Sequence, residues 1–158
     1  MSAYITPGRS KVYWVVTVSD PTDPTPSEIN AGTDLTNKLR GIPAVPRTGN
    51  LADISNLSST FEARQRGTVG GDVATFELLR DTLTETAYDI MDEGDEGYLI
   101  ILRKGIAGTQ VAVGDKCDVF PATVNAVSDG SPGRNDPDFA VFEIAITANP
   151  SRDISITT

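Results

Sequence analysis

Short runs of β-branched and aromatic residues, separated by clusters of Gly, Pro, Asn and Asp, constrain the fold of this chain most strongly. Such runs are typical of β-strands, and the clusters between them are typical of turns. The pattern predicts strands over residues 11–18 (KVYWVVTV), 60–68, 73–80, 97–103 (GYLIILR), 115–127 and 138–149. We expect the strand over 115–127 to be broken or bulged at Pro121, because proline donates no hydrogen bond within a sheet.

Two of these predicted strands are separated only by a glycine-containing segment. Gly70 and Gly71 lie between the runs 60–68 and 73–80, and glycine is common in the turns that join antiparallel strands. We therefore expect residues 60–80 to form a β-hairpin. Val73 and Leu79 place apolar side chains on the otherwise polar face of its second strand, which predicts partial burial of both faces.

One segment has the signals of an α-helix. It begins near Asp81 or Thr82, and Thr82 and Glu85 have the spacing of a capping box. Its apolar residues fall on one stripe at helical spacing: Leu83, Ala87, Ile90 and Met91. The 158 residues are the length of a single domain. Strands with one helix predict a mainly β fold over residues 1–158, either a β-sandwich or a β-roll with one flanking α-helix.

Residues 20–58 lack a sustained hydrophobic period and contain five prolines. A loop of this length is unusual inside a compact domain. A short helical turn between Ile29 and Leu39 is disfavoured by Gly32 and Thr33. The segment nevertheless carries apolar side chains that need a surface to bury them, among them Ile29, Leu35, Leu39 and Ile42. We expect a long assembly arm or loop over about residues 20–58, with these four residues in an inter-subunit contact.

The composition provides few groups for catalysis or metal binding. The chain has no histidine, and its single cysteine, Cys117, is expected to be a small core residue. The four lysines form no Ser-x-x-Lys arrangement. Acidic residues at 92–96 and at Asp129, Asp136 and Asp138 lack the spacing of a calcium-binding loop, and we expect solvated turns. We therefore expect no enzyme activity, no cofactor and no metal.

Charge and hydropathy argue against two kinds of binding partner, nucleic acid and membrane. Thirteen basic against 22 acidic residues give a net charge of −9, which disfavours a protein that binds nucleic acid through phosphate contacts. No apolar run approaches the roughly 20 residues that span a bilayer, and residues 1–10 lack the apolar core of a signal peptide. We expect a soluble protein made in the cytoplasm, with no membrane partner. A β-rich chain without catalytic groups, with a long apolar-bearing arm, is most simply explained by self-assembly.

The order and texture of these segments resemble the major tail proteins, or tail tube proteins, of long-tailed bacteriophages. The resemblance spans nearly the whole chain. It is carried by the early strand KVYWVVTV, the arm DPTDPTPSEINAGTDLTNKLRGIP, the central FEARQRGTVGGDVATFELLRD and the closing CDVFPATVNAVSDGSPGRNDPDFAVFEIAIT. It implies a ring-forming subunit, with hexameric rings that stack into the hollow tail tube through which DNA leaves the capsid.

The resemblance also implies partners and a location. The partners are other copies of the chain, further tail proteins (tape measure, terminator, and baseplate or tip) and viral DNA in transit. The location is the virion tail, after synthesis in the host cytoplasm. In this family, one sheet of each subunit joins its neighbours in a barrel around the lumen. If the predicted hairpin 60–80 contributes to that barrel, the lumen-facing residues are Glu62, Arg64, Arg66 and Glu77, with Glu143 from the last predicted strand.

A second interpretation is a β-sandwich adhesion or decoration module of a phage or bacterium. Such a binding module would be expected to cluster exposed aromatic residues on one loop or face. Trp14, Tyr13, Phe61 and Phe76 all lie instead in predicted strands, which favours the assembly subunit.

Overall fold

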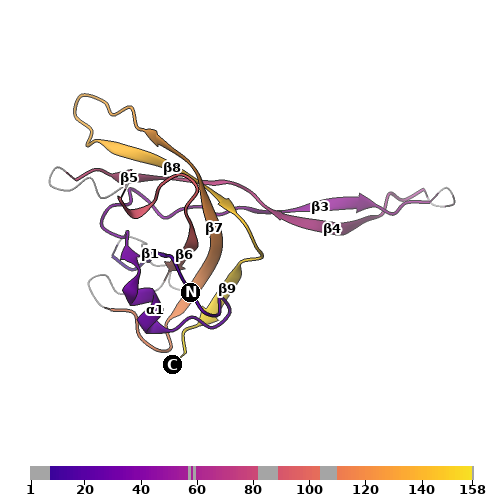
Figure 1. The fold of residues 1–158 in the computed structure, drawn as a ribbon. Coiled ribbons are helices and arrows are strands. Elements are labelled where there is room, and N and C mark those ends of the chain that lie inside the picture. Colours follow the sequence, from indigo (N-terminus) through magenta and orange to yellow (C-terminus); the bar gives the residue numbers. More distant parts are fainter. Residues whose placement is uncertain (1–7, 57, 59, 82–88, 104–109, 158) are drawn as a thin grey trace.

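The computed structural model describes residues 8–56, 58, 60–81, 89–103 and 110–157 (Figure 1). Within these residues the chain is mostly β-structure with a short helix, α1 (Pro26–Ala31). The strands are β1 (Lys11–Val15), β2 (Thr33–Asp34), β3 (Arg47–Asp53), β4 (Arg64–Gly71), β5 (Ala74–Leu79), β6 (Glu96–Leu102), β7 (Lys116–Asp129), β8 (Phe139–Ile146) and β9 (Ser151–Ser155). This confirms the predicted mainly β fold class.

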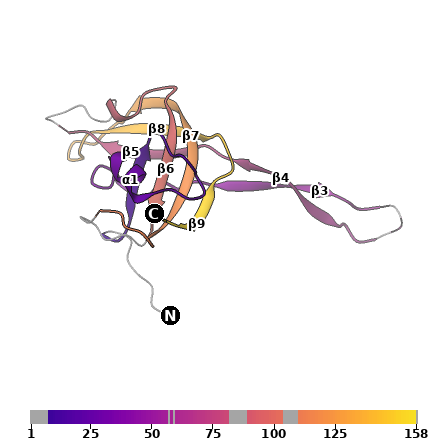
Figure 2. The same cartoon turned by 60° about the horizontal axis from the view of Figure 1, so that its bottom comes forward.

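All strands except β3 and β4 belong to one antiparallel sheet, in the order β2-β1-β6-β7-β8-β5, with β9 also paired to β7. Strand β7 connects the two halves of this sheet. Its first half pairs with β6 and β9, and its second half pairs with β8. The sheet curls about β7, so that β5 and β8 lie over β1 and β6 (Figures 1 and 2). We call this curled sheet with its covering segments the body.

The main core fills the inside of the curl. Alternate residues of β5 and β8 point inward, as the period of two of a strand requires. Phe76 and Phe142, directly opposite in the register, stack with ring centroids 5.8 Å apart. The core also contains Trp14 from β1, which packs so closely on β6 that a Cβ at Gly97 would lie 2.7 Å from the indole ring.

A second core lies on the outer face of β1, β6 and the first half of β7. Helix α1 covers it with Ile29, and the C-terminal segment covers it with Ile156. The helix begins at a capping box, in which Thr25 accepts a hydrogen bond from the Glu28 N–H and the Glu28 carboxylate accepts one from the Thr25 N–H. Strand β6 is therefore covered on both faces, which explains its nearly continuous apolar run.

The segment 20–46 lies against the body, and the inter-subunit contact predicted for Ile29 and Leu35 is wrong. Ile29 and Leu35 are fully buried in their own subunit. Leu39 and Ile42 are half-buried and pack against the main core. The backbone of residues 38–40 also pairs with the edge of β5, through hydrogen bonds from Arg40 N to Glu77 O and from Leu79 N to Lys38 O.

The predicted hairpin over residues 60–80 is also wrong. Strand β4 pairs with β3, and β5 pairs with β8. Gly70 and Gly71 lie inside β4, and no turn forms there. The reason is a close approach: a Cβ at Gly71 would lie 2.9 Å from the Cβ of Ile146. Glycine at this position therefore permits close packing, and its presence does not mark a turn.

The predicted break or bulge at Pro121 is wrong, because Pro121 keeps its place in the register opposite Tyr98 and its carbonyl accepts a hydrogen bond from the Thr147 N–H. The bulges of β7 lie instead near Cys117 and Asn125. The acidic turn at residues 92–95 forms and is exposed. The predicted helix from 81 or 82 to 91 lies largely outside the described residues. At its end, residues 89–90 are helical and Met91 is buried in the main core.

Candidate assembly surfaces

Strands β3 and β4 form a separate two-stranded sheet that projects from the body (Figures 1 and 2). From here on, the arm means residues 47–71, in place of the arm predicted over about residues 20–58. Every residue of both strands is exposed. The arm carries large apolar side chains in the open, including Leu51 (64% exposed), Ile54 and Phe61 (74% exposed). An isolated two-stranded hairpin is at best marginally stable in water, so this surface has the character of an interface that another molecule covers.

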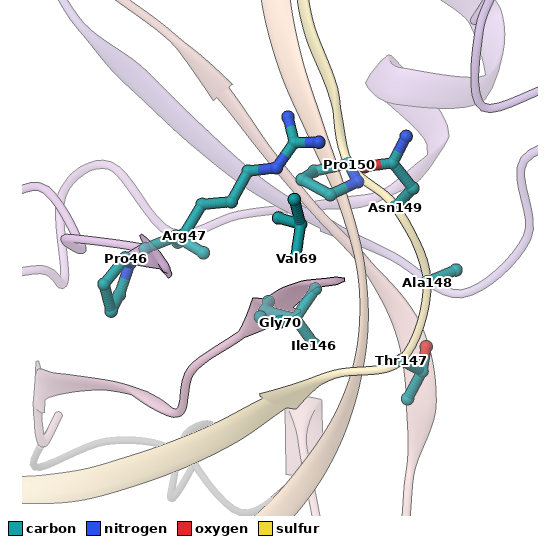
Figure 3. A pocket seen from close by; sticks show the side chains of 11 residues that line it. Pro46, Arg47, Val69, Gly70, Ile146, Thr147, Ala148, Asn149 and Pro150 are labelled. Carbon is teal, nitrogen blue, oxygen red and sulfur yellow. The ribbon is translucent and has the colours of Figure 1, made fainter. Parts of the chain in front are cut away.

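The arm is attached to the body at a defined root. The Asp72 N–H donates to the Pro46 carbonyl, and the Arg152 guanidinium donates to the Val45 carbonyl over 3.3 Å. A hollow of about 220 Å³ lies at this root. It is lined by Arg47 and Val69 of the arm and by the β8–β9 connection around Pro150 (Figure 3). Because Gly71 packs directly on Ile146 beside this hollow, the base of the arm is held against the sheet.

The arm and the rest of the chain differ in net charge. The arm contains three arginines (Arg47, Arg64 and Arg66) and two carboxylates, whereas the rest of the chain contains ten basic and twenty acidic residues. The arm is therefore slightly basic, and the remainder carries a formal charge of −10. Because opposite charges attract across an interface and like charges repel, contact of an arm with another body is favoured over contact between two bodies.

The outer face of β5, β8 and the second half of β7 is the other open surface. The register places Thr75 opposite Glu143 and Glu77 opposite Val141 on this face. The Glu77 carboxylate forms an ion pair with Arg40 at 3.2 Å, and the Glu143 carboxylate accepts from the Asn125 amide. Neither α1 nor the C-terminal segment covers this face, in contrast to the outer face of β6.

The residues predicted to face a lumen therefore fall into two groups. Glu77 and Glu143 share the open sheet face. Glu62, Arg64 and Arg66 lie on the arm, where Arg64 and Glu62 form a long ion pair of 3.9 Å. The structure does not bring the five together, because the hairpin that would have joined them does not exist.

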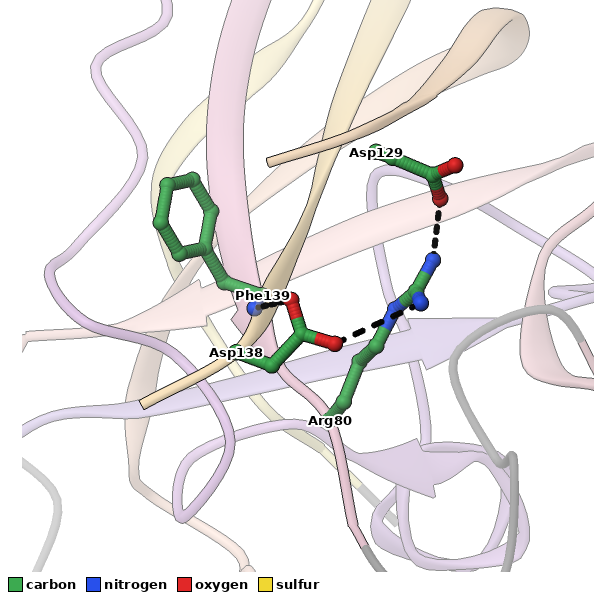
Figure 4. Close-up of polar contacts among 4 residues, drawn as sticks. All are labelled: Arg80, Asp129, Asp138 and Phe139. Atoms are coloured by element: carbon green, nitrogen blue, oxygen red, sulfur yellow. Dashed lines mark hydrogen bonds and ion pairs between the residues drawn. The ribbon is translucent and has the colours of Figure 1, made fainter. Parts of the chain in front are cut away.

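An ion-pair cluster fixes the end of this open face. Arg80, just after β5, pairs with Asp129 at the end of β7 and, over 3.5 Å, with Asp138 before β8 (Figure 4). The Arg80 N–H also donates to the Asp138 carbonyl. The cluster ties both ends of the β7–β8 connection to β5, which identifies a structural role for these acidic residues.

Groups that support chemistry are scarce in the described part of the chain. No group of three or more His, Cys, Asp or Glu residues there could hold a metal ion. Cys117 is buried, as predicted, and burial raises the pKa of its thiol to about 12, so that it stays protonated at neutral pH. None of the described helices is long and apolar enough to cross a bilayer.

This geometry defines a β-sheet subunit with a projecting hairpin and an open sheet face. The sequence matches the phage tail tube protein family over residues 1–158, and the chain belongs to that family. The fold is similar to a chain in a cryo-EM structure of the anti-feeding prophage (AFP) baseplate, 6-fold symmetrised. The TM-score is 0.60 at 10% sequence identity, over 94% of this chain and 95% of that chain. No curated protein matches the sequence. The chain is thus a structural protein of a phage tail.

Proposed function

We propose that the chain polymerises into stacked hexameric rings that form the tail tube, the conduit through which viral DNA is ejected. The observation that carries this proposal is the arm, on which every residue of β3 and β4 is exposed and the apolar side chains of Leu51 and Ile54 are more than half exposed. Membership of the tail tube family supports the tube, and the 6-fold symmetry named for the similar baseplate structure supports a ring of six.

Within such a tube, the open face of β5, β8 and β7 is the surface we assign to the lumen. Away from the Arg80 cluster at its end, the described charged residues on this face are Glu77 and Glu143, and the Arg40 guanidinium beside Glu77 is already paired with it. A basic bore would hold DNA by releasing counterions from its phosphates, whereas a neutral or acidic bore leaves DNA free to slide. The paired and acidic character of this face therefore suits passage of DNA. Glu62, Arg64 and Arg66 are assigned to the arm contact instead.

Assembly itself is tested by size-exclusion chromatography and negative-stain electron microscopy of the purified chain. We expect rings or tubes, with the fraction of polymer rising with protein concentration. The adhesion or decoration module predicts a monomer or small oligomer without a central channel, and that result at high concentration would contradict the proposal.

The lumen assignment is tested by labelling cysteines in assembled tubes. Glu77→Cys and Glu143→Cys, each in a Cys117→Ala background, should react with a small maleimide and be protected from one too bulky to enter the bore. Asp136→Cys, in the exposed β7–β8 connection, provides a comparison position away from the open sheet face. Equal labelling of Glu77→Cys and Glu143→Cys by both reagents would place these residues on the outside of the tube.

A further inference from the structure

A groove on the body lies where β1 ends, β6 begins and β8 ends, and has a volume of about 220 Å³. Its apolar lining includes Val16, Tyr98 and Pro121, and Glu96 stands at its side. Val16 is 69% exposed, more than any other large apolar side chain in the described part of the body. The groove is smaller than the roughly 300–1,000 Å³ typical of small-molecule sites, and its size suits a side chain from a protein partner.

Glu96 differs from the acidic residues beside it. Asp92 and Asp95 each accept a hydrogen bond from a backbone N–H within the turn, and Glu93 accepts one from the Val127 N–H of β7. The exposed carboxylate of Glu96 has no hydrogen-bond or ion-pair partner in the described part of the chain. The groove therefore combines apolar lining residues with a carboxylate that is available to a cation.

The arm presents the complementary combination. Leu51 of β3 and Arg66 of β4 are directly opposite in the register, so their side chains lie on the same face of the hairpin. Leu51 is exposed, and Arg66 has no ion-pair partner among the described residues. Leu51 could therefore enter the groove while the neighbouring Arg66 guanidinium pairs with the Glu96 carboxylate.

The arm cannot fill the groove of its own chain. Strand β3 has seven residues and spans about 23 Å at about 3.3 Å per residue, and it runs away from the body (Figures 1 and 2). For comparison, a compact body of about 130 residues has a radius of gyration of about 14 Å. The arm is thus long enough to extend over the body of a second copy.

We propose that the groove formed by Val16, Tyr98 and Pro121 receives Leu51 from the arm of a second copy, and that Arg66 of that arm pairs with Glu96. This inference rests on the proposed self-assembly and specifies its contact. Donor and acceptor surfaces are different patches of the chain, so the contact is head-to-tail. Such contacts close into rings or continue as helices, and they do not form two-fold dimers.

Reversal of each charge tests this pairing. Glu96→Arg and Arg66→Glu each place like charges together, and we expect each to raise the critical concentration for assembly by at least about tenfold, measured by pelleting in an ultracentrifuge. The double variant Glu96→Arg/Arg66→Glu restores an opposite-charge pair between copies, and should return the critical concentration to near the wild-type value. Asp136→Arg makes the same charge change in the β7–β8 connection and should assemble normally.

The outcomes separate this inference from the proposed function. A wild-type chain that forms no polymer would refute self-assembly itself. A wild-type chain that polymerises, with Glu96→Arg polymerising equally well, would refute the groove as the receptor. Two defective single variants without rescue in the double variant would also refute the pairing, and would point to another surface or another tail protein as the occupant. Circular dichroism and thermal unfolding of each variant verify that the body is folded.

Discussion

In the body, β6 is covered on both faces and β5 and β8 bury alternate residues, whereas in the arm every residue of β3 and β4 is exposed. Both regions are antiparallel β-structure. The apolar side chains of the body are buried within one subunit. Those of the arm, as we propose, are buried only between subunits. Stability and assembly should therefore be separable by mutation.

The largest expected effect is the loss of assembly on removal of the arm. Replacing residues 47–71 by a short Gly-Ser turn retains Pro46 and Asp72, which are already joined by a backbone hydrogen bond. We expect a folded monomer that forms no tubes, by size-exclusion chromatography and negative-stain microscopy. The contrasting deletion of residues 20–46 removes Ile29 and Leu35 from the two cores and should unfold the chain. Normal polymerisation of the chain without residues 47–71 would show that the arm is not required for assembly.

A matched pair of leucines gives the next largest effect. Leu35 is fully buried in the body, and Leu51 is exposed on the arm. Leu35→Ala should lower the free energy of unfolding of the monomer by about 2–5 kcal/mol, as expected for truncation of a core leucine. Leu51→Ala should change it by less than about 0.5 kcal/mol, as expected at the surface, while weakening assembly. Chemical denaturation measures both, and similar losses for the two variants would show that the arm belongs to the folded core.

A pair of glycines, one in the body and one on the arm, should show the same contrast in stability with smaller effects. A Cβ at Gly97 would lie 2.7 Å from the Trp14 ring and 3.0 Å from the Val15 carbonyl oxygen, whereas a Cβ at Gly70 would meet nothing within 4 Å. Gly97→Ala should destabilise the monomer by about 1–3 kcal/mol through overpacking. Gly70→Ala, on the arm, should leave its thermal midpoint nearly unchanged. If Gly97→Ala were tolerated as well as Gly70→Ala, the close packing of β1 on β6 would be in doubt.

The smallest effect is a pH dependence that originates in the body. Hydrogen bonds to the Glu28 carboxylate, first from the Ser19 hydroxyl and then from the Thr25 N–H, lower its pKa from 4.5 to about 2. A lowered pKa in the folded state contributes stability above the unfolded pKa, and this contribution is lost as pH falls from about 4.5 to about 2. Glu28→Gln should reduce the fall in thermal midpoint over that range.

Asp53 on the arm provides the control, because its pKa is also lowered, chiefly by a hydrogen bond from the Ser55 hydroxyl. Asp53→Asn should leave the acid response of the body unchanged, since the arm does not contribute to its cores. An equal effect of the two substitutions would indicate that arm and body unfold together.

The sequence predicts the body better than the arm, because the body signals are local. The run GYLIILR corresponds closely to β6, and the alternation after residue 138 corresponds to β8. The elements of segment 20–46 were missed because α1 has six residues and β2 has two, too short for a period to emerge. A usable signal was present at the start of α1, where Thr25, Pro26 and Glu28 have the spacing of a capping box with proline at the first helical position.

The pairing of β3 with β4 depends on contacts that are distant in sequence. The glycines at 70 and 71 suggested a local turn, and only the packing of Gly71 on Ile146 shows why glycine is needed there. The groove was likewise inaccessible to sequence reasoning, since Val16, Tyr98 and Pro121 come from three strands or strand ends that meet only in the folded sheet.

Cryo-electron microscopy of the polymer formed by the wild-type chain tests the central claim most directly. Our account predicts rings of six subunits, with the β3–β4 arm of each lying on the body of another copy and Leu51 within reach of its Val16, and with Glu77 and Glu143 facing the channel. A polymer whose arms project freely into solvent, or whose subunits contact one another without them, would contradict it.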